Sequence, residues 1–150
     1  MNYWLIKSEP ETYSIDHLKR DKVTAWEGVR NYQARNHMRS MKKGDLILFY
    51  HSSTDPAGIA GVARVSAPAH ADMSQFKKGD YFEPRATKEK PVWECVDVEY
   101  VETAARYVPL EALRQDKALS SMVLLQRGSR LSVQPVTAAE FAHIRSLMRV

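Results

Sequence analysis

Apolar residues along the chain gather in short runs, which are separated by polar stretches that contain proline and glycine. The first run, Tyr3 to Lys7 (YWLIK), predicts a strand that ends at the Ser8-Glu9-Pro10 sequence. Leu46 to Tyr50 (LILFY) is apolar throughout, as expected of a central strand that is buried on both faces. The polar loop 52–58 and the run Ile59 to Val65 then indicate a hairpin, in which small residues let two backbones approach closely.

Helical spacing and capping residues predict four helices. Ser14 is a suitable N-cap for a short helix, and Thr137 with Glu140 forms a capping box at the start of the last one. The segment from Asn31 to Met41 has apolar residues on one face and arginines on the others, which predicts a basic amphipathic helix. A further helix is expected over residues 110–119, from its leucine spacing.

The middle of the chain combines a long irregular segment with further short strands. Ala67 to Pro91 has three prolines and little periodicity, which predicts a long excursion, and its aromatic residues indicate a packed lid. Trp93 to Val101 alternates in polarity, as in a strand with one wet face, and a bulge is expected near Glu94. Met122 to Leu125 and Leu131 to Val133 are predicted as strands on either side of a glycine-containing turn.

Several short strands with peripheral helices predict one α+β domain over residues 1–150, built around a small, strongly bent sheet or barrel. The length of 150 residues, with 44% hydrophobic and 27% charged residues, suits one soluble core. No apolar run approaches the roughly 18 residues of a membrane span, so no membrane partner is expected. The single Cys95 excludes an internal disulfide and a zinc ribbon, which favours a cytoplasmic location.

The net charge of +4 is unevenly distributed along the chain. From Lys19 to Lys43 there are eight basic and two acidic residues, a local net charge of +6, so the remainder sums to −2. Glu94, Asp97, Glu99 and Glu102 form an acidic run without an intervening base. We therefore expect one basic and one acidic face, and the basic face favours an anionic partner.

Sequence signatures of catalysis are absent. The chain has no nucleophile elbow, phosphate-binding glycine loop, dinucleotide fingerprint or zinc-binding HExxH helix. Its five histidines are scattered singly, without ligand spacing, and Cys95 lies in a strand-like run beside Val96. These observations predict a protein that is not an enzyme and that needs neither a metal nor another cofactor.

A cluster of aromatic, amide and cationic side chains lies within ten residues of Trp26. An indole face can stack on a base, Asn and Gln amides match donor and acceptor pairs on base edges, and arginines bind phosphate oxygens. The alternative interpretation, that Trp26 belongs to the core and the arginines only solvate a helix, stays open. The cluster comprises Trp26, Arg30, Asn31, Tyr32, Gln33 and Arg35.

Two polar pairs follow predicted strands, where pockets commonly form. Lys7 and Ser8 end the first strand, and His51 with Ser52 ends the LILFY strand. Such groups can recognise a base edge, although Ser8 and Ser52 are equally suited to begin loops. The turn 127–130 carries two arginines, which suits either phosphate contact or an ordinary hairpin.

These motifs resemble the EVE domain family, which has a PUA-like fold and is related to the YTH domains that read methylated adenine in RNA. The similarity extends from residue 3 to residue 135 and so covers nearly the whole chain. The motifs that carry it are residues 3–10 (YWLIKSEP), 26–36 (WEGVRNYQARN), 49–52 (FYHS), 58–61 (GIAG) and 130–135 (RLSVQP).

The resemblance implies a small bent barrel with surrounding helices and a pocket for a modified base. Trp26 would be one wall of an aromatic cage, with Lys7, Ser8 and Glu9 along the adjacent strand end. Glu9 stands where YTH domains present an asparagine, and a carboxylate accepts hydrogen bonds only, which suits the exocyclic amine of cytosine or adenine. Modified cytosine is the favoured ligand, and Tyr81, Phe82 or Trp93 could form the second wall.

The sequence therefore predicts a non-enzymatic domain whose partner is a nucleic acid carrying a modified base, either a modified cytosine in DNA or a modified base in RNA. Two alternatives stay open: an enzyme or binder that uses the same pocket for a small molecule or nucleoside, and an interaction module working with restriction or RNA-modification systems. The expected base pocket comprises Lys7, Ser8, Glu9, Trp26, Asn31, Tyr32, Gln33, His51, Ser52 and Trp93. The expected backbone contacts are Arg30, Arg35, Arg39, Arg127 and Arg130.

Overall fold

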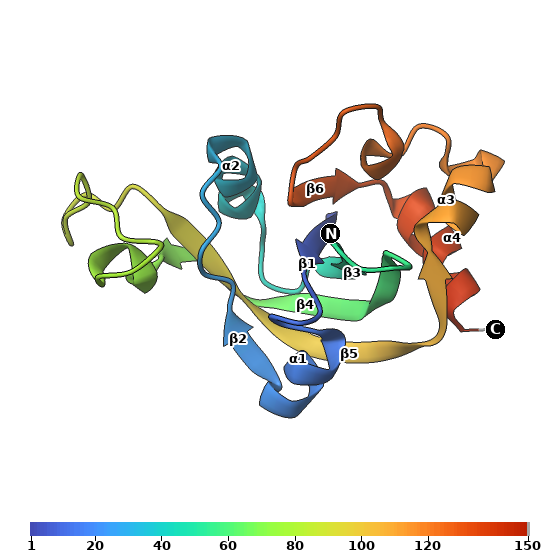
Figure 1. Cartoon of the computed structure of the whole chain (residues 1–150), viewed down its shortest axis with the longest axis horizontal. Helices are drawn as coiled ribbons and strands as arrows, with labels where there is room; N and C mark the ends of the chain where they lie inside the picture. Colours follow the sequence, from blue (N-terminus) through green and yellow to red (C-terminus); the bar gives the residue numbers. More distant parts are fainter. Residues whose placement is uncertain (150) are drawn as a thin grey trace.

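The computed structural model describes residues 1–149 and contains a mixed sheet with helices packed around it (Figure 1). The strands are β1 (Tyr3–Ser8), β2 (Val23–Ala25), β3 (Leu46–His51), β4 (Gly58–Ala71), β5 (Glu94–Pro109) and β6 (Val133–Val136). The α-helices are α1 (Ile15–Asp21), α2 (Tyr32–Ser40), α3 (Leu110–Gln115) and α4 (Ala138–Met148). Three short 3₁₀ helices cover Met73–Phe76, Lys117–Leu119 and Val123–Leu125.

The strand order is β2-β5-β4-β3-β1-β6, with β1 parallel to β3 and the other neighbours antiparallel. The α+β class is confirmed, but the sheet over residues 1–149 is open rather than closed into a barrel. Its edge strands β2 and β6 have three and four residues, and each pairs with a single neighbour. One register shift between β3 and β4 and four between β4 and β5 bend the long central strands.

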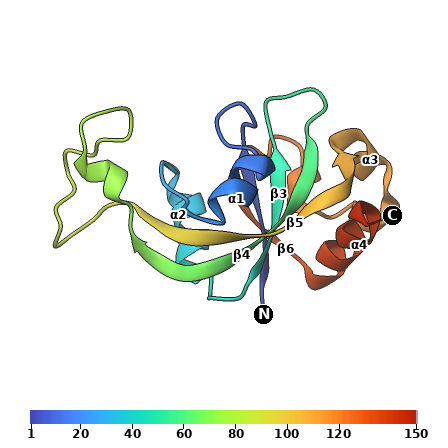
Figure 2. The same ribbon diagram turned by 90° about the horizontal axis from the view of Figure 1, so that it is seen from below.

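Two hydrophobic cores lie on opposite faces of the central strands. Alternate residues of β3 enter different cores: Ile47 and Phe49 join the core covered by α1 and α2, whereas Leu48 and Tyr50 join the core covered by α3 and α4. Both views show the pair α3 and α4 at one end of the molecule, apart from α1 and α2 (Figures 1 and 2). The prediction of a central strand buried on both faces is confirmed.

The helix predictions that rest on capping residues are confirmed. Ser14 accepts a hydrogen bond from His17 N at the start of α1, and Thr137 with Glu140 forms the capping box of α4. Asn31 is the N-cap of α2. The helix expected over 110–119 ends at Gln115, because the side chain of Asp116 caps the separate 3₁₀ turn that follows.

Other predicted elements differ from the structure. Residues 123–125 form a 3₁₀ helix, not a strand, and no hairpin surrounds the turn 127–130, because β6 begins at Val133 and pairs with β1. The segment expected to be irregular from Ala67 is still part of β4 as far as Ala71. The bulge expected near Glu94 lies on the partner strand, since β4 has an extra residue between its pairings with Asp97 and Cys95.

The prediction of a separate acidic face is wrong, because each acid of the run on β5 lies beside a base from another element. The pairs are Glu94 with Arg39, Asp97 with His70, Glu99 with Arg64, and Glu102 with both Arg145 and Arg149. Opposite charges within ion-pair distance cancel much of each other's field.

Among residues 1–149, every helix is too short or too polar to cross a lipid bilayer.

A buried carboxylate fixes the start of β1 to the turn before β3. Asp45, 3% exposed, accepts hydrogen bonds from Trp4 Nε1 at 3.0 Å, Lys42 N at 3.0 Å and Asn2 N at 3.2 Å. Burial alone would raise the pKa of Asp45, but the hydrogen bonds from Trp4, Lys42 and Asn2 outweigh this effect and lower the pKa.

We expect Asp45→Ala to lower the free energy of unfolding by about 3 kcal/mol, because three donors lose a charged acceptor. Urea denaturation at pH 7 measures this, with the exposed Asp55→Ala as control, expected within about 0.5 kcal/mol of wild type. Since the folded pKa of Asp45 is depressed, its stabilisation is present above the unfolded pKa of about 3.9 and is lost as pH falls through the folded pKa. Equal acid sensitivity of wild type and Asp45→Ala would contradict this role.

Candidate functional site

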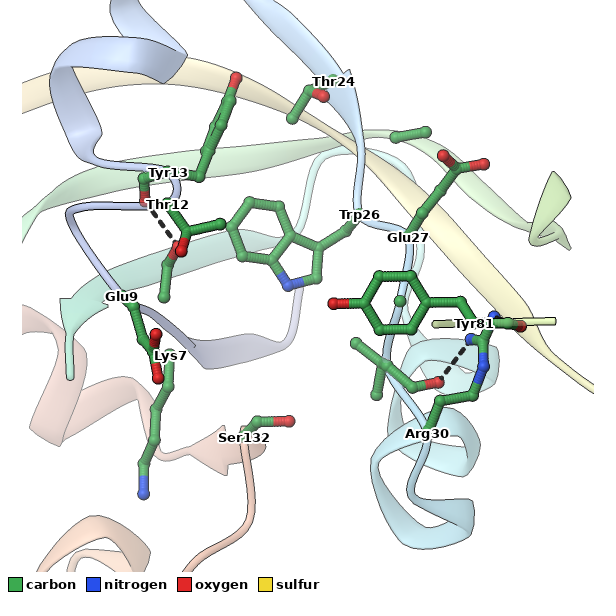
Figure 3. Close-up of a pocket in the computed structure, with 14 residues that line it drawn as sticks. Lys7, Glu9, Thr12, Tyr13, Thr24, Trp26, Glu27, Arg30, Tyr81 and Ser132 are labelled. Carbon is green, nitrogen blue, oxygen red and sulfur yellow. Dashed lines mark hydrogen bonds between the residues drawn. The ribbon is translucent and has the colours of Figure 1, made fainter. Parts of the chain in front are cut away.

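A cavity of about 500 Å³ opens beside the C-terminal end of β1 (Figure 3). It is bordered by the loop after β1, the segment that connects β2 to α2, and two residues from distant parts of the chain. The lining residues are Lys7, Ser8, Glu9, Thr12, Tyr13, Thr24, Ala25, Trp26, Glu27, Gly28, Val29, Arg30, Tyr81 and Ser132. Its size is within the range of ligand pockets, about 300–1,000 Å³.

Trp26 forms one wall of the cavity. Its backbone N–H extends the β2–β5 ladder by donating to Val96 O at 2.9 Å, and its ring packs edge to face on Tyr13 and Phe49, with centroids 5.9 and 5.7 Å away. The side chain is half-buried, and its indole nitrogen faces the cavity (Figure 3). Trp26 therefore packs on the core and also presents an aromatic surface to the cavity.

Tyr81 faces Trp26 from the loop 72–93. Its ring lies directly over Gly28, where an added Cβ would come within 3.0 Å of Tyr81 Cζ, and Gly28 has a φ of +89°. Both conditions favour glycine at this position. Figure 3 shows the Tyr81 hydroxyl directed toward Trp26. Of the three residues considered for the second wall, Tyr81 lines the cavity, whereas Phe82 and Trp93 do not.

The position of Tyr81 depends on Arg30. The guanidinium donates to Tyr81 O at 2.8 Å, to Ser74 Oγ at 3.0 Å and to Asp72 Oδ2 at 3.1 Å. Asp72 is fully buried and also accepts from Gly28 N at 2.9 Å. Burial would raise the pKa of Asp72, but hydrogen bonds from Ser74, Gly28 and Arg30 lower it instead. Arg30 was predicted to contact a nucleic-acid backbone, but its side chain instead joins the segment after β2 to the loop 72–93.

Gln75 closes the base of the same loop. Its buried amide nitrogen donates to the carbonyl oxygens of Asp72 and Trp93, both at 2.7 Å, and its amide oxygen accepts from Val92 N and Trp93 N at 3.0 and 2.8 Å. All four hydrogen-bonding positions of the amide are used. One side chain therefore holds the two ends of the loop together.

Two predicted site residues on α2, Tyr32 and Arg35, contact the end of the loop 72–93, where a third predicted residue, Trp93, lies; none of the three lines the cavity. Tyr32 stacks on the buried Trp93 with centroids 4.8 Å apart, and Arg35 lies 4.8 Å from the Tyr32 ring while donating to Val92 O at 2.8 Å. Glu83 accepts from Trp93 Nε1 at 3.1 Å. This arrangement fixes the loop against the helix.

The end of β1 supplies the polar side of the cavity. Figure 3 shows Lys7 and the Glu9 carboxylate on the side opposite Tyr81. Partial burial lowers the pKa of Lys7. The Ser8 hydroxyl donates to Tyr13 O at 2.5 Å, which fixes the loop after the strand.

The remaining predicted base-pocket residues lie outside the cavity lining. The Asn31 side chain caps α2 by accepting from Ala34 N, and His51 Nε2 accepts from Ile15 N at the start of α1. Burial lowers the pKa of His51, which favours the neutral ring that accepts this bond. Ser52 pairs through its backbone with Ser8, and Gln33 lines a separate groove.

The arginines predicted to contact a nucleic-acid backbone fall into two groups. Like Arg30, Arg35 and Arg39 are engaged within the protein, Arg35 by its hydrogen bond to Val92 O and Arg39 by its ion pair with Glu94. Arg127 and Arg130 are exposed on the loop that leads to Ser132 at the rim of the cavity. Eight lining residues are not among the predicted ones: Thr12, Tyr13, Thr24, Ala25, Glu27, Gly28, Val29 and Ser132. No local signal marks Ser132, because only the pairing of β6 with β1 brings it there.

The chemistry of the cavity suits a planar, uncharged heterocycle. Trp26 and Tyr81 offer aromatic surfaces, the Trp26 indole nitrogen and Lys7 are donors, and Glu9 is an acceptor. Within residues 1–149 there is no group of three or more His, Cys, Asp or Glu arranged to hold a metal ion.

The fold and the cavity define a small α+β domain with an aromatic-walled pocket at the end of a central strand. The model of the EVE domain family matches residues 2–147, and the chain belongs to this family. Thymocyte nuclear protein 1 from Mus musculus is 44% identical, over 97% of this chain and 73% of its own length. The Homo sapiens protein of the same name is 40% identical over the same shares.

Solved structures agree with this assignment. A protein from Leishmania major has a TM-score of 0.93 and 46% identity, covering 99% of this chain and 94% of its own. The human THYN1 protein, solved in complex with DNA containing 5-methylcytosine, has a TM-score of 0.93 and 39% identity, covering 100% and 99%. An ASCH protein from Zymomonas mobilis shares the fold, with a TM-score of 0.57 and 11% identity.

Gly28→Ala tests the contact with Tyr81. We expect it to cost about 2–3 kcal/mol of unfolding free energy, because it adds a clash to the left-handed backbone cost of about 1–2 kcal/mol. Gly128→Ala is the matched control, with a φ of +77° and nothing within 4 Å of the added Cβ. Urea denaturation measures how much more unfolding free energy Gly28→Ala loses than Gly128→Ala, and this difference should disappear when Tyr81 is also replaced by Ala. A difference that persists in the Tyr81→Ala background would show that the clash is with another residue.

Proposed function

We propose that this domain binds DNA carrying 5-methylcytosine and holds the modified base, rotated out of the helix, in the cavity between Trp26 and Tyr81. The observation that carries this proposal is the complex of the human relative with 5-methylcytosine DNA, at 39% identity over the full chain. The cavity supports it independently, since it joins aromatic surfaces to polar groups able to recognise a base edge.

Trp26 and Glu9 have distinct roles in this proposal. The Trp26 ring stacks on the base, which is worth about 1–3 kcal/mol, and so offsets the few kcal/mol needed to extrude a base from duplex DNA. The Glu9 carboxylate accepts a hydrogen bond from the exocyclic N4 amine of cytosine. Because thymine has a carbonyl oxygen at that position, Glu9 would reject it although it carries the same 5-methyl group.

Arg127 and Arg130 are the proposed contacts to the phosphate backbone, because they are exposed on the loop that ends at the cavity rim. The segment from Lys19 to Lys43 contributes less than its charge suggests, since Arg30 and Arg39 are each paired with an acid from outside the segment. Affinity that depends on phosphate contacts falls as salt rises.

A binding panel at two salt concentrations tests the proposal and its alternatives. Matched duplexes with 5-methylcytosine, cytosine or thymine at one position are compared with a methylated RNA and with free 5-methyldeoxycytidine. We expect the methylated duplex to bind most tightly and more weakly at higher salt. Preference for the RNA would assign the pocket to RNA, and binding of the free nucleoside alone, without salt dependence, would favour a small-molecule binder.

Trp26→Ala should weaken binding of the methylated duplex about 10- to 100-fold, which corresponds to the loss of one stacking interaction. Trp26→Phe keeps a smaller aromatic face and should recover part of the affinity. Fluorescence anisotropy with a labelled duplex measures both, and circular dichroism confirms that the variants fold. Unchanged affinity in folded Trp26→Ala would refute the stacking role.

Glu9→Gln should reduce discrimination between 5-methylcytosine and thymine about 10-fold, since a neutral amide can donate to thymine O4 as well as accept from cytosine N4. The two bases carry the same methyl group, so their affinity ratio reports on this polar contact. Glu11→Gln, an exposed position outside the cavity lining, is the matched control and should leave the ratio unchanged. An unchanged affinity ratio of 5-methylcytosine to thymine in Glu9→Gln would show that another group recognises the base edge.

A further inference from the structure

The loop that supplies the Tyr81 wall also presents a phenylalanine to solvent. Phe82 directly follows Tyr81 and is 49% exposed. Single exposed apolar residues are common on protein surfaces and need no explanation by themselves. Phe82 differs because its backbone is fixed next to a residue that lines the cavity.

Hydrogen bonds on both sides hold the backbone of Phe82 in place. Arg30 donates to the carbonyl oxygen of the preceding Tyr81 at 2.8 Å, and the N–H of the following Glu83 donates to Gln75 O at 2.9 Å. Phe82 N itself donates to Gly79 O at 3.2 Å. Because this backbone is already fixed, binding through Phe82 costs little backbone conformational entropy.

The surroundings of Phe82 suit a polyanion. Figures 1 and 2 show the segment around residues 77–92 projecting beyond the sheet at the opposite end from α3 and α4. Four exposed lysines lie on this projection and form no ion pair with any residue in the range 1–149: Lys77, Lys78, Lys88 and Lys90. Asp80 and Glu89 of the same segment are also exposed and without an ion pair to residues 1–149, so the four lysines leave it a net charge of +2. An apolar ring on a segment of net positive charge can contact bases while the lysines contact phosphates.

We propose that Phe82 enters the DNA duplex beside the extruded base and fills the space that this base leaves in the stack. This inference rests on the proposed function, because it requires a base to be held in the adjacent cavity. Removing a base from a duplex leaves its neighbours unstacked, and proteins that deform DNA often insert Phe, Leu, Ile or Met between base steps. Tyr81 would contact the extruded base while Phe82 replaces it.

A comparison of duplex with single-stranded DNA isolates this role, because a single strand has no duplex stack to repair. The probe is one labelled oligonucleotide with a central 5-methylcytosine, used alone and annealed to its complement. We expect Phe82→Ala to bind the duplex about 10-fold more weakly and the single strand within twofold of wild type. Trp26→Ala should weaken both, since its contact is with the base itself.

Two further variants serve as controls. Met73→Ala removes an apolar side chain of similar exposure, 46%, from the start of the same loop and should leave both affinities unchanged. Phe82→Leu retains a side chain able to enter the stack and should recover part of the duplex affinity. Thermal unfolding verifies that all variants remain folded.

The possible outcomes separate this inference from the proposed function. If Phe82→Ala lost equal affinity for the duplex and the single strand, the insertion of Phe82 into the duplex would be refuted, and Phe82 would instead belong to the base pocket. No loss on either would also refute this insertion. If wild type itself shows no preference for the methylated oligonucleotide in either form, the proposed function fails, and the inference fails with it.

Discussion

Burial of the parallel pair β1 and β3 on both faces is the constraint on which the rest of the structure depends. Because successive side chains point to opposite faces, Leu48 and Phe49 belong to different cores, and each core needs its own helices. α1 and α2 cover one face, and α3 and α4 cover the other. The parallel strands end at the same edge of the sheet, and the polar residues Lys7 and Glu9 leave the core there to become one side of the cavity.

The opposite side of the cavity is organised by buried polar groups. Asp72 and Gln75 are fully buried, and their hydrogen bonds join both ends of the loop 72–93 to each other and to Arg30. A buried polar group that loses its partner is costly, so such a network permits few alternative arrangements. It holds Tyr81 in place although its ring is half-exposed, and it gives the neighbouring Phe82 a defined position.

How much of the site could be predicted depended on the range of the interaction that places each residue. Trp26, Lys7, Ser8 and Glu9 were predicted from strand ends and family motifs, and they line the cavity. Asn31 is a pocket candidate by its amide group and His51 by its place at a strand end, but helix N-termini use the acceptors of both side chains. Asn and His suit capping as well as base recognition, so composition alone cannot separate the two uses.

The central strand buried on both faces and the capped helices are predictable from the sequence, because periodicity and capping act between residues close in the chain. The family and the aromatic residue at position 26 are likewise recognised from short local motifs. Long-range contacts instead bring Tyr81 to the cavity opposite Trp26, place Ser132 at its rim and leave the sheet open. They also pair the acidic run with bases. These features depend on strand register and on contacts between residues far apart in the chain, since charges and rings interact through space, not along the sequence.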